Sequence, residues 1–284
     1  METGFTFKNR HSSEFGITMR TTSRPIRPEM KSYKYESPLA DGSYDFSAAN
    51  SYGHEFYKNR AFTVTASVAA ENITALMRRV SDISVWLMGK GILTFDDTPF
   101  IEWRASVPGS IDYVPERYGR KAILGITFEV EPFAMLEFGT GDGPLLDSEI
   151  HIDSSVYIGI DDAYTYALSG TANTEIANTG DWYVRPVFTV TAENPFKSFC
   201  ISCGNKSFTV TQEGLTDMVI DMNKHTVKTV SGTDIKNFDG DMFELPPGNT
   251  QIRTAAEMVS GDADYTLSVV FTSKYMNFAD EERF

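Results

Sequence analysis

Apolar and polar residues alternate with a period of two along most of the chain. In residues 62–68 the apolar side chains occupy every second position, so they share one face of a strand, and Thr and Ser occupy the other. The same alternation recurs in residues 123–131 and 265–271, which are rich in the Thr, Val, Phe and Tyr that sheets favour. The pattern predicts that most of the protein is antiparallel sheet.

One segment follows helical spacing instead. Its apolar residues recur at steps of three and four: Ile73, Leu76, Met77, Val80, Ile83 and Leu87. Asn72 can cap the start of a helix, and Gly89 can end it. The spacing predicts a helix over residues 72–88 that covers one face of the first sheet. Trp86 lies just beside this apolar stripe and belongs either to the core or to an interface.

The helix is followed by two strand-like runs, residues 92–95 and 100–104. They are separated by Asp96, Asp97, Thr98 and Pro99, which predict a tight hairpin connection. Two adjacent aspartates also suggest a metal site or acid/base chemistry. Turn chemistry alone accounts for Asp at these positions, so a solvated turn is the favoured interpretation.

A Gly-rich segment, residues 138–144, divides the chain. Its G-x-G lacks a third glycine at the right spacing, and Pro144 is incompatible with a simple phosphate-binding helix start, so it is interpreted as a linker. Beyond it, short strand-like runs alternate with turns at a spacing typical of a β-sandwich. We therefore predict two domains, residues 1–137 and 138–284, the first with one long helix and the second all-β.

The composition sets limits on the protein class. The chain has 284 residues, of which 41% are hydrophobic and 13% aromatic, enough for sizeable cores. No run approaches the roughly 20 apolar residues of a membrane helix, and no apolar stretch near the start resembles a signal peptide. With 2 cysteines the chain does not resemble a disulfide-stapled secreted scaffold. We expect a soluble protein made in a reducing cytoplasm, without membrane insertion.

The charge is unevenly distributed between the two parts. The net charge is −14, with −1 in residues 1–140 and −13 in residues 141–284. Binding to nucleic acid usually requires an excess of basic residues that neutralise phosphates. We therefore expect no stable nucleic-acid binding, and two units with different surroundings.

The residues with reactive side chains form no recognisable catalytic motif. Cys200 and Cys203 form a single C-x-x-C in a strand-like run, and residues three apart on a strand point to opposite faces. The histidines are scattered at His11, His54, His151 and His225. The sequence contains no G-x-S-x-G motif and no P-loop. These observations predict no catalytic residues, no metal site and no cofactor, so we expect that the protein is not an enzyme.

Short motifs stand in a definite order along the first part of the chain. They are residues 4–9 (GFTFKN), 13–17 (SEFGI), 38–46 (PLADGSYDF), Arg60, the hairpin 92–103 and the exit 128–134 (FEVEPFA). In this order they resemble the distal tail protein (Dit) family of siphophage-type tails, with its F-x-F-N-G, S-x-x-F-G-I, P-G-R-D-G-x-Y-D, L-x-F-D-D and P-F-A. Arg10 stands where the family has Gly, and Leu39 and Ala40 depart from the third motif.

The second part of the chain continues the resemblance. Its motifs are residues 178–180 (NTG), 185–188 (RPVF), 220–221 (ID) and 245–252 (LPPGNTQI). They stand where the family has N-x-G, I-D and P-G-x-N-x-I. Each motif is short, so the resemblance depends on their order over nearly the whole chain.

The resemblance implies a structural protein at the tip of a phage tail. Family members form a hexameric ring that joins the tail tube to tape-measure, baseplate, receptor-binding or other tail-associated proteins. The implied fold is mainly β (α+β): a tail-tube-like β-barrel or sheet with one long helix, followed by an outward galectin-like β-sandwich. The implied location is the virion tail tip, after assembly in the host bacterial cytoplasm.

Candidate site residues follow from each hypothesis. For subunit contacts in a ring the aromatic candidates are Trp86, Phe95 and Trp103. An alternative function is a carbohydrate-binding adhesin, in which exposed aromatic residues of the sandwich stack on sugars: Tyr164, Tyr166, Trp182 and Tyr183. The same aromatics also suit a core or an interface. A third hypothesis is a secreted or cell-surface glycosidase, and the missing signal peptide counts against it.

Overall fold

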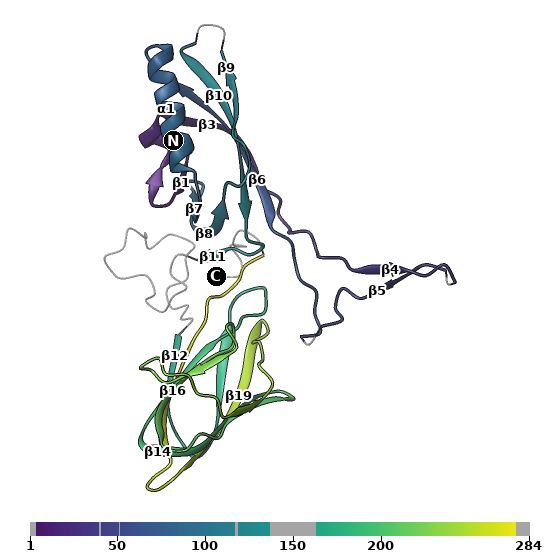
Figure 1. The fold of residues 1–284 in the computed structure, drawn as a ribbon, viewed down its shortest axis with the longest axis vertical. Coiled ribbons are helices and arrows are strands. Elements are labelled where there is room, and N and C mark those ends of the chain that lie inside the picture. The colour runs from purple at the N-terminus through teal and green to yellow at the C-terminus, as the bar shows by residue number, and fades with distance from the viewer. Residues whose placement is uncertain (1–3, 40, 51, 117–118, 137–162, 277–284) are drawn as a thin grey trace. The chain divides into compact units, whose positions relative to one another are not determined.

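The computed structural model describes residues 4–39, 41–50, 52–116, 119–136 and 163–276 (Figure 1). The chain divides into two compact units. Unit 1 comprises Met1–Glu137 and Met276–Asp280, and unit 2 comprises Phe138–Tyr275 and Glu281–Phe284. The predicted linker at residues 138–144 lies outside the described residues. The chain therefore returns to unit 1 at Met276 after completing unit 2.

Unit 1 is built on an antiparallel sheet of nine strands. Along the sheet the order is β2-β1-β7-β8-β10-β6-β3, with β9 beside β10 and β11 beside β8. The strands are β1 (Phe5–Phe7), β2 (Arg10–His11), β3 (Ile17–Ser23), β6 (Arg60–Ala69), β7 (Lys90–Phe95), β8 (Thr98–Ser106), β9 (Asp112–Pro115), β10 (Lys121–Val130) and β11 (Met135–Leu136). Within the described residues the sheet is open, so the barrel alternative of the predicted fold is not formed in the single chain.

The two central strands confirm the predicted alternation. Strands β6 and β10 pair without interruption from Arg60 opposite Val130 to Ala69 opposite Lys121. Every second side chain is buried, and the same face carries the buried aromatic rings of β1, β7 and β8. The period of two thus places one apolar face inward across five neighbouring strands.

The predicted helix is present as α1 (Ile73–Trp86). The Asn72 side chain accepts a hydrogen bond from the Ala75 N–H at 2.9 Å, which confirms the predicted cap. Only Leu76, Ile83 and Trp86 of the helix are buried. The predicted apolar stripe is therefore wider than the stripe that the sheet covers.

The start of the chain turns through a short 3-10 helix, η1 (Ser12–Phe15). Gly16 ends this helix with φ +63°, a left-handed conformation that glycine adopts without steric cost. A Cβ at Gly16 would lie 2.7 Å from the end of the flexible Arg79 side chain, which can move aside, so it is the backbone conformation that favours glycine here. The glycine of the motif at residues 13–17 is thus explained by the left-handed backbone conformation at this position.

Residues 24–58, here called the arm, leave the sheet between β3 and β6. Their strands β4 (Lys34–Glu36) and β5 (Ser43–Asp45) form a separate two-stranded sheet, which is visible as its own ribbon in Figure 1. An isolated two-stranded hairpin is marginally stable in water, because it has no second layer to cover its apolar face. The arm is thus the part of unit 1 with the least tertiary support.

Unit 2 is all-β within the described residues. Its strands are β12 (Ala163–Ser169), β13 (Thr171–Asn178), β14 (Val187–Cys203), β15 (Lys206–Val210), β16 (Leu215–Asp221), β17 (Thr226–Lys228), β18 (Phe238–Gly240), β19 (Gly248–Met258) and β20 (Asp264–Val270). The long strand β14 pairs with β16 and β20 in its first half and with β15 and β19 in its second half. The register shifts near Pro195, where β14 exchanges one pair of neighbouring strands for the other.

Both halves of β14 contribute to one core. Phe188 and Val190 of the first half and Phe199 and Ile201 of the second half belong to the same buried cluster. Cys203 packs against this core, and Cys200 lies on the other face, as the strand spacing predicts.

Candidate functional site

The three predicted interface residues lie inside unit 1. Trp86, Phe95 and Trp103 are 6%, 1% and 0% exposed. The Trp86 ring stacks on Phe15 with 4.2 Å between centroids, and its Nε1–H donates to the Phe7 carbonyl at 3.0 Å. These side chains build the core, so the surface that a neighbouring subunit could touch consists of other residues.

Large exposed apolar side chains of the described residues are distributed unevenly. In unit 1 they form two groups and one isolated residue, Val114. One group lies on the arm: Ile26, Tyr33, Tyr35, Leu39, Tyr44 and Phe46. The other, here called the helix flank, lies on and just after α1: Ile73, Met77, Val85 and Met88. Contiguous exposed apolar residues mark interaction sites more often than scattered ones.

The arm has one aromatic face. Tyr35 lies directly opposite Tyr44, and the Phe46 N–H donates to the Tyr33 carbonyl at 2.9 Å. Residues that face each other across an antiparallel pair project to the same side. The aromatic face of the arm therefore consists of Tyr33, Tyr35, Tyr44 and Phe46, exposed by 72%, 59%, 54% and 45%. Lys34 and Asp45 project to the opposite, polar side.

The base of the arm is paired and packed. Lys31 N–H donates to the Phe56 carbonyl and Lys58 N–H to the Glu29 carbonyl, both at 2.7 Å. The rings of His54 and Phe56 lie 5.1 Å apart, and His54 is buried. The base thus has a small apolar centre of its own, which the aromatic face lacks.

The two adjacent aspartates of the β7–β8 turn anchor other segments. Arg24 Nη1, at the start of the arm, donates to Asp97 Oδ1 at 3.0 Å, and this hydrogen bond lowers the pKa of Asp97. Asp96 accepts the Gly4 N–H at 2.6 Å, and His11 Nε2 lies 3.1 Å from its other oxygen. The predicted turn is confirmed, and its carboxylates hold the N-terminal strand and the arm rather than facing only solvent.

Arg60 is the functional residue that the sequence reasoning underrated. It is 3% exposed, and its guanidinium donates to the carbonyls of Pro25, Ile26, Pro132 and Met276 at 2.6–3.2 Å. Burial lowers its pKa to about 10, still far above neutrality, so it remains charged. One side chain therefore joins the start of the arm, the exit of unit 1 and the residue at which the chain returns. The sequence does indicate that Arg60 is buried, because it stands two residues before Phe62 and therefore lies on the same inward face of β6.

The helix flank extends the buried stripe of α1 to one side. Ile73 and Met77 lie one helical turn apart and are 59% and 44% exposed. Val85 and Met88, at the C-terminal end, are 66% and 65% exposed, and Val85 comes two residues after the buried Ile83, so it projects away from the buried side of the helix. The sequence pattern placed Ile73 and Met77 in the core, but the sheet covers only the neighbouring side of the helix.

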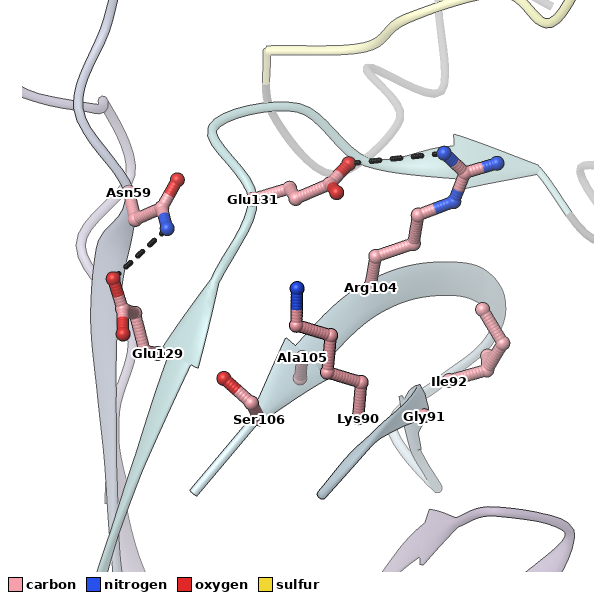
Figure 2. A pocket seen from close by; sticks show the side chains of 9 residues that line it. All are labelled: Asn59, Lys90, Gly91, Ile92, Arg104, Ala105, Ser106, Glu129 and Glu131. Carbon is pink, nitrogen blue, oxygen red and sulfur yellow. Dashed lines mark hydrogen bonds and ion pairs between the residues drawn. The ribbon is translucent and has the colours of Figure 1, made fainter. Parts of the chain in front are cut away.

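A shallow depression of about 320 Å³ lies on the sheet at the ends of β7, β8 and β10. Figure 2 shows its charged side chains, with Asn59 donating to Glu129 at 2.9 Å and Arg104 lying 4.0 Å from Glu131. Lys90 adds a second positive charge. The depression is balanced in charge, and its lining residues include no histidine or cysteine that could act as a base or nucleophile.

The sugar-stacking candidates of unit 2 are partly buried. The parallel rings of Tyr164 and Tyr166 lie 6.3 Å apart, and their hydroxyls donate to the Ala177 and Glu175 carbonyls at 2.8 and 2.6 Å. Trp182 and Tyr183 pack edge to face at 5.6 Å. An open depression of about 790 Å³ lies beside the end of β12, the start of β20 and the middle of β14, and none of these four aromatics lines it.

The described residues show neither a metal-binding group nor a membrane-spanning helix. No group of three or more His, Cys, Asp or Glu side chains in the described part of the chain is arranged to hold a metal ion. Its one α-helix is too short and too polar to cross a membrane. Within these residues, the two exposed apolar groups of unit 1 are thus the most distinctive surface features.

The comparisons with known proteins agree with this description of the fold. No known protein family matches the sequence, and neither does any curated protein. Among solved structures the chain is similar to the Dit protein of phage SPP1, described as a paradigm of the hub adsorption apparatus in phages that infect Gram-positive bacteria. The TM-score is 0.65 at 16% identity, and the likeness covers 96% of this chain and 98% of that one. The chain therefore has a Dit-like fold over nearly its whole length.

Proposed function

We propose that this protein is a structural hub of a phage tail tip, which forms a ring, expected to be hexameric, between the tail tube and the baseplate or receptor-binding proteins. The main support for the proposal is that 96% of the chain has a fold similar to that of a Dit protein, although the two sequences are only 16% identical. In this role unit 1 builds the ring, and unit 2, as a galectin-like sandwich, faces outward. The location is the virion tail tip.

The distribution of exposed apolar residues supports unit 1 as the assembling part. Identical subunits close a ring through a heterologous interface, in which one surface meets a different surface of the next copy. Unit 1 has two such surfaces, the aromatic face of the arm and the helix flank. Residues 1–140 carry a net charge of −1, so copies of this part can approach without the repulsion expected between parts that carry −13.

The role requires no catalysis. We propose that the protein has no enzymatic activity, no metal and no cofactor, and that it holds no nucleic acid stably. A hydrolysis screen on peptidoglycan fragments and common glycosides should show no turnover above background. Reproducible turnover that disappears on substitution of one carboxylate would contradict the structural role.

The assembly state of the purified full-length protein tests the ring directly. Light scattering and negative-stain images at micromolar concentration, with and without the tail tube protein, should show six-fold rings or an equilibrium that the tube protein shifts toward rings. Subunits that remain monomeric with the tube protein present would contradict the proposal. A dimer formed by unit 2 alone, or glycan binding that depends on Trp182 or Tyr183, would favour the adhesin alternative.

A further inference from the structure

We propose that residues 273–276, here called the tether, pass a movement of unit 2 to the start of the arm through the Arg60 side chain. The coupling acts within one chain, so it goes beyond the proposed function and does not require a ring. Three features support it: the tether is anchored in unit 2, its last residue is bound by Arg60 in unit 1, and Arg60 also binds the start of the arm.

The first three residues of the tether are held by a turn of unit 2. The Asp181 N–H donates to the Lys274 carbonyl at 2.8 Å. The Thr179 hydroxyl oxygen lies 3.3 Å from that of Ser273 and 3.0 Å from that of Tyr275. Ser273 and Tyr275 are buried. These three residues therefore move with unit 2.

The last residue of the tether is bound in unit 1. The Arg60 guanidinium donates to the Met276 carbonyl at 2.6 Å. Its other N–H groups donate to the carbonyls of Pro25, Ile26 and Pro132 at 2.6–3.2 Å. The side chain thus uses all of its N–H donors, because a guanidinium carries five and Pro132 accepts two of these hydrogen bonds. Since Arg60 is buried, loss of one acceptor leaves a buried donor unsatisfied, which is costly.

Two properties make this junction sensitive to small movements. Tyr275 and Met276 are adjacent in the chain, so no flexible residue separates the anchor in unit 2 from the anchor in unit 1. A guanidinium is planar and holds its N–H groups in a rigid arrangement, so Arg60 follows a displaced carbonyl only by moving as a whole. A displacement of about 1 Å is enough, because a hydrogen bond stretched to about 3.6 Å is no longer one.

The start of the arm then loses part of its support. When the guanidinium moves toward a displaced tether, its two hydrogen bonds to the start of the arm lengthen. The paired base of the arm, closed by the amides of Lys31 and Lys58, follows directly in the chain. Arg24 remains bound to Asp97, so the arm loosens without being released. A force on unit 2 thus reaches the arm.

Hydrogen exchange of the full-length chain, measured by mass spectrometry, tests the coupling. Gly180→Ala displaces the tether, because the added Cβ would lie 2.6 Å from the Lys274 amide nitrogen and 2.7 Å from its carbonyl oxygen. We expect the amides of Lys31 and Lys58 to exchange faster by about threefold or more, whereas those of the β6–β10 pairs keep their rates.

Gly240→Ala is the matched control. Its added Cβ would meet the Ser207 carbonyl oxygen, so it also disturbs the backbone of unit 2, but where β15 pairs with β18. The arm should then exchange as in the unsubstituted protein. Equal acceleration of the arm by both glycine variants would assign the effect to general destabilisation of unit 2 and overturn the proposal.

A milder variant covers the case in which Gly180→Ala unfolds unit 2. Thr179→Val removes the hydroxyl that contacts Ser273 and Tyr275 but keeps a side chain of similar volume. It should accelerate exchange in the arm in the same direction by a smaller factor. An arm that exchanges at the original rate in Thr179→Val and in every folded Gly180→Ala sample contradicts the coupling.

A double-mutant cycle tests the route through Arg60. Arg60→Lys keeps the positive charge, but a single ammonium nitrogen cannot hold carbonyls of three segments at once. Arg60→Lys alone should therefore accelerate exchange in the arm, and Gly180→Ala added to it should cause no further change. If Gly180→Ala has the same effect with and without Arg60→Lys, or if Arg60→Lys leaves the arm unchanged, the movement does not pass through Arg60 and the proposal is wrong.

Discussion

The main sheets of units 1 and 2 each contain nine antiparallel strands within the described residues, but the two units leave different surfaces exposed. In unit 2 the long strand β14 pairs with four other strands, and both of its halves contribute to the same core. Its large exposed apolar residues are few and scattered along the sequence: Val230, Phe238, Val259 and Val270. In unit 1 a single helix covers the sheet, and the arm has no covering layer. Its exposed apolar residues accordingly gather on the arm and on the helix.

The difference shows how a folded subunit can reserve surface for assembly. Burial of apolar area is the main favourable contribution to both folding and association. Apolar residues that are not buried on folding therefore remain available for association. Within residues 163–275, unit 2 uses most of its large apolar side chains internally, and the second half of the chain carries most of the negative charge. Unit 1 keeps two apolar surfaces and is close to neutral. The predictions below separate the two units experimentally.

The largest effect is expected from the core of unit 2. Phe188 is fully buried, and Phe188→Ala should destabilise unit 2 by about 3–5 kcal/mol through lost contacts and a residual cavity. Calorimetry of the full chain should show that only one of two transitions moves. A fragment of residues 145–275 should fold alone and lose the same stability. If the fragment is unfolded by circular dichroism, or if both transitions move together, the two units are not independent.

Loss of the Arg60 guanidinium should destabilise unit 1 by about 3 kcal/mol, because Arg60→Met leaves several buried carbonyls without a donor. Arg60→Lys keeps the charge with fewer donors and should cost less. Urea denaturation of a Trp182→Phe variant, monitored by the fluorescence of Trp86 and Trp103, reports on this unit, because Trp182 lies in unit 2. A loss confined to unit 2, or none at all, would show that Arg60 is not the anchor of unit 1.

Salt should affect assembly in the direction expected for apolar contacts. Raising the ionic strength screens the repulsion between copies that each carry −14, while contacts between apolar side chains are not weakened. Light scattering should show that ring formation is unchanged or strengthened by about two- to threefold in 0.5 M salt. Dissociation of the rings by salt would instead indicate an interface held by ion pairs.

The smallest effect is expected for the ion pair at the start of the arm. The hydrogen bond from Arg24 lowers the pKa of Asp97 in the folded state, so the pair adds stability above the ordinary carboxyl pKa and loses it as the pH falls through the folded value. Because Asp97 is partly exposed, Asp97→Asn should cost about 0.5 kcal/mol at neutral pH. The difference from the unsubstituted protein should vanish once the pH falls below the lowered pKa of Asp97 in the folded state. A difference that grows on acidification would contradict this assignment.

Local sequence patterns determined the elements of this protein. Alternation placed Phe62, Val64 and Val68 on the inward face of β6, and Asn72 with the three- and four-residue spacing placed α1 within about two residues. Asp96 and Asp97 marked the β7–β8 turn. These features depend on backbone geometry over a few residues, so neighbouring positions contain the information. The order of short motifs likewise indicated the Dit-like layout that the solved structure shares.

Only the tertiary structure decided which apolar faces are covered. A periodic pattern shows which side chains share a face, but the neighbour that packs on that face comes from distant parts of the chain. Trp86 is therefore buried by Phe5 and Phe15, whereas Met77 on the same helix remains exposed. The tyrosines of the arm have the same strand pattern as buried positions elsewhere, yet no second layer forms over them. Arg60 acquires its role for the same reason, because its four carbonyl partners belong to three separate segments that meet only in the folded unit.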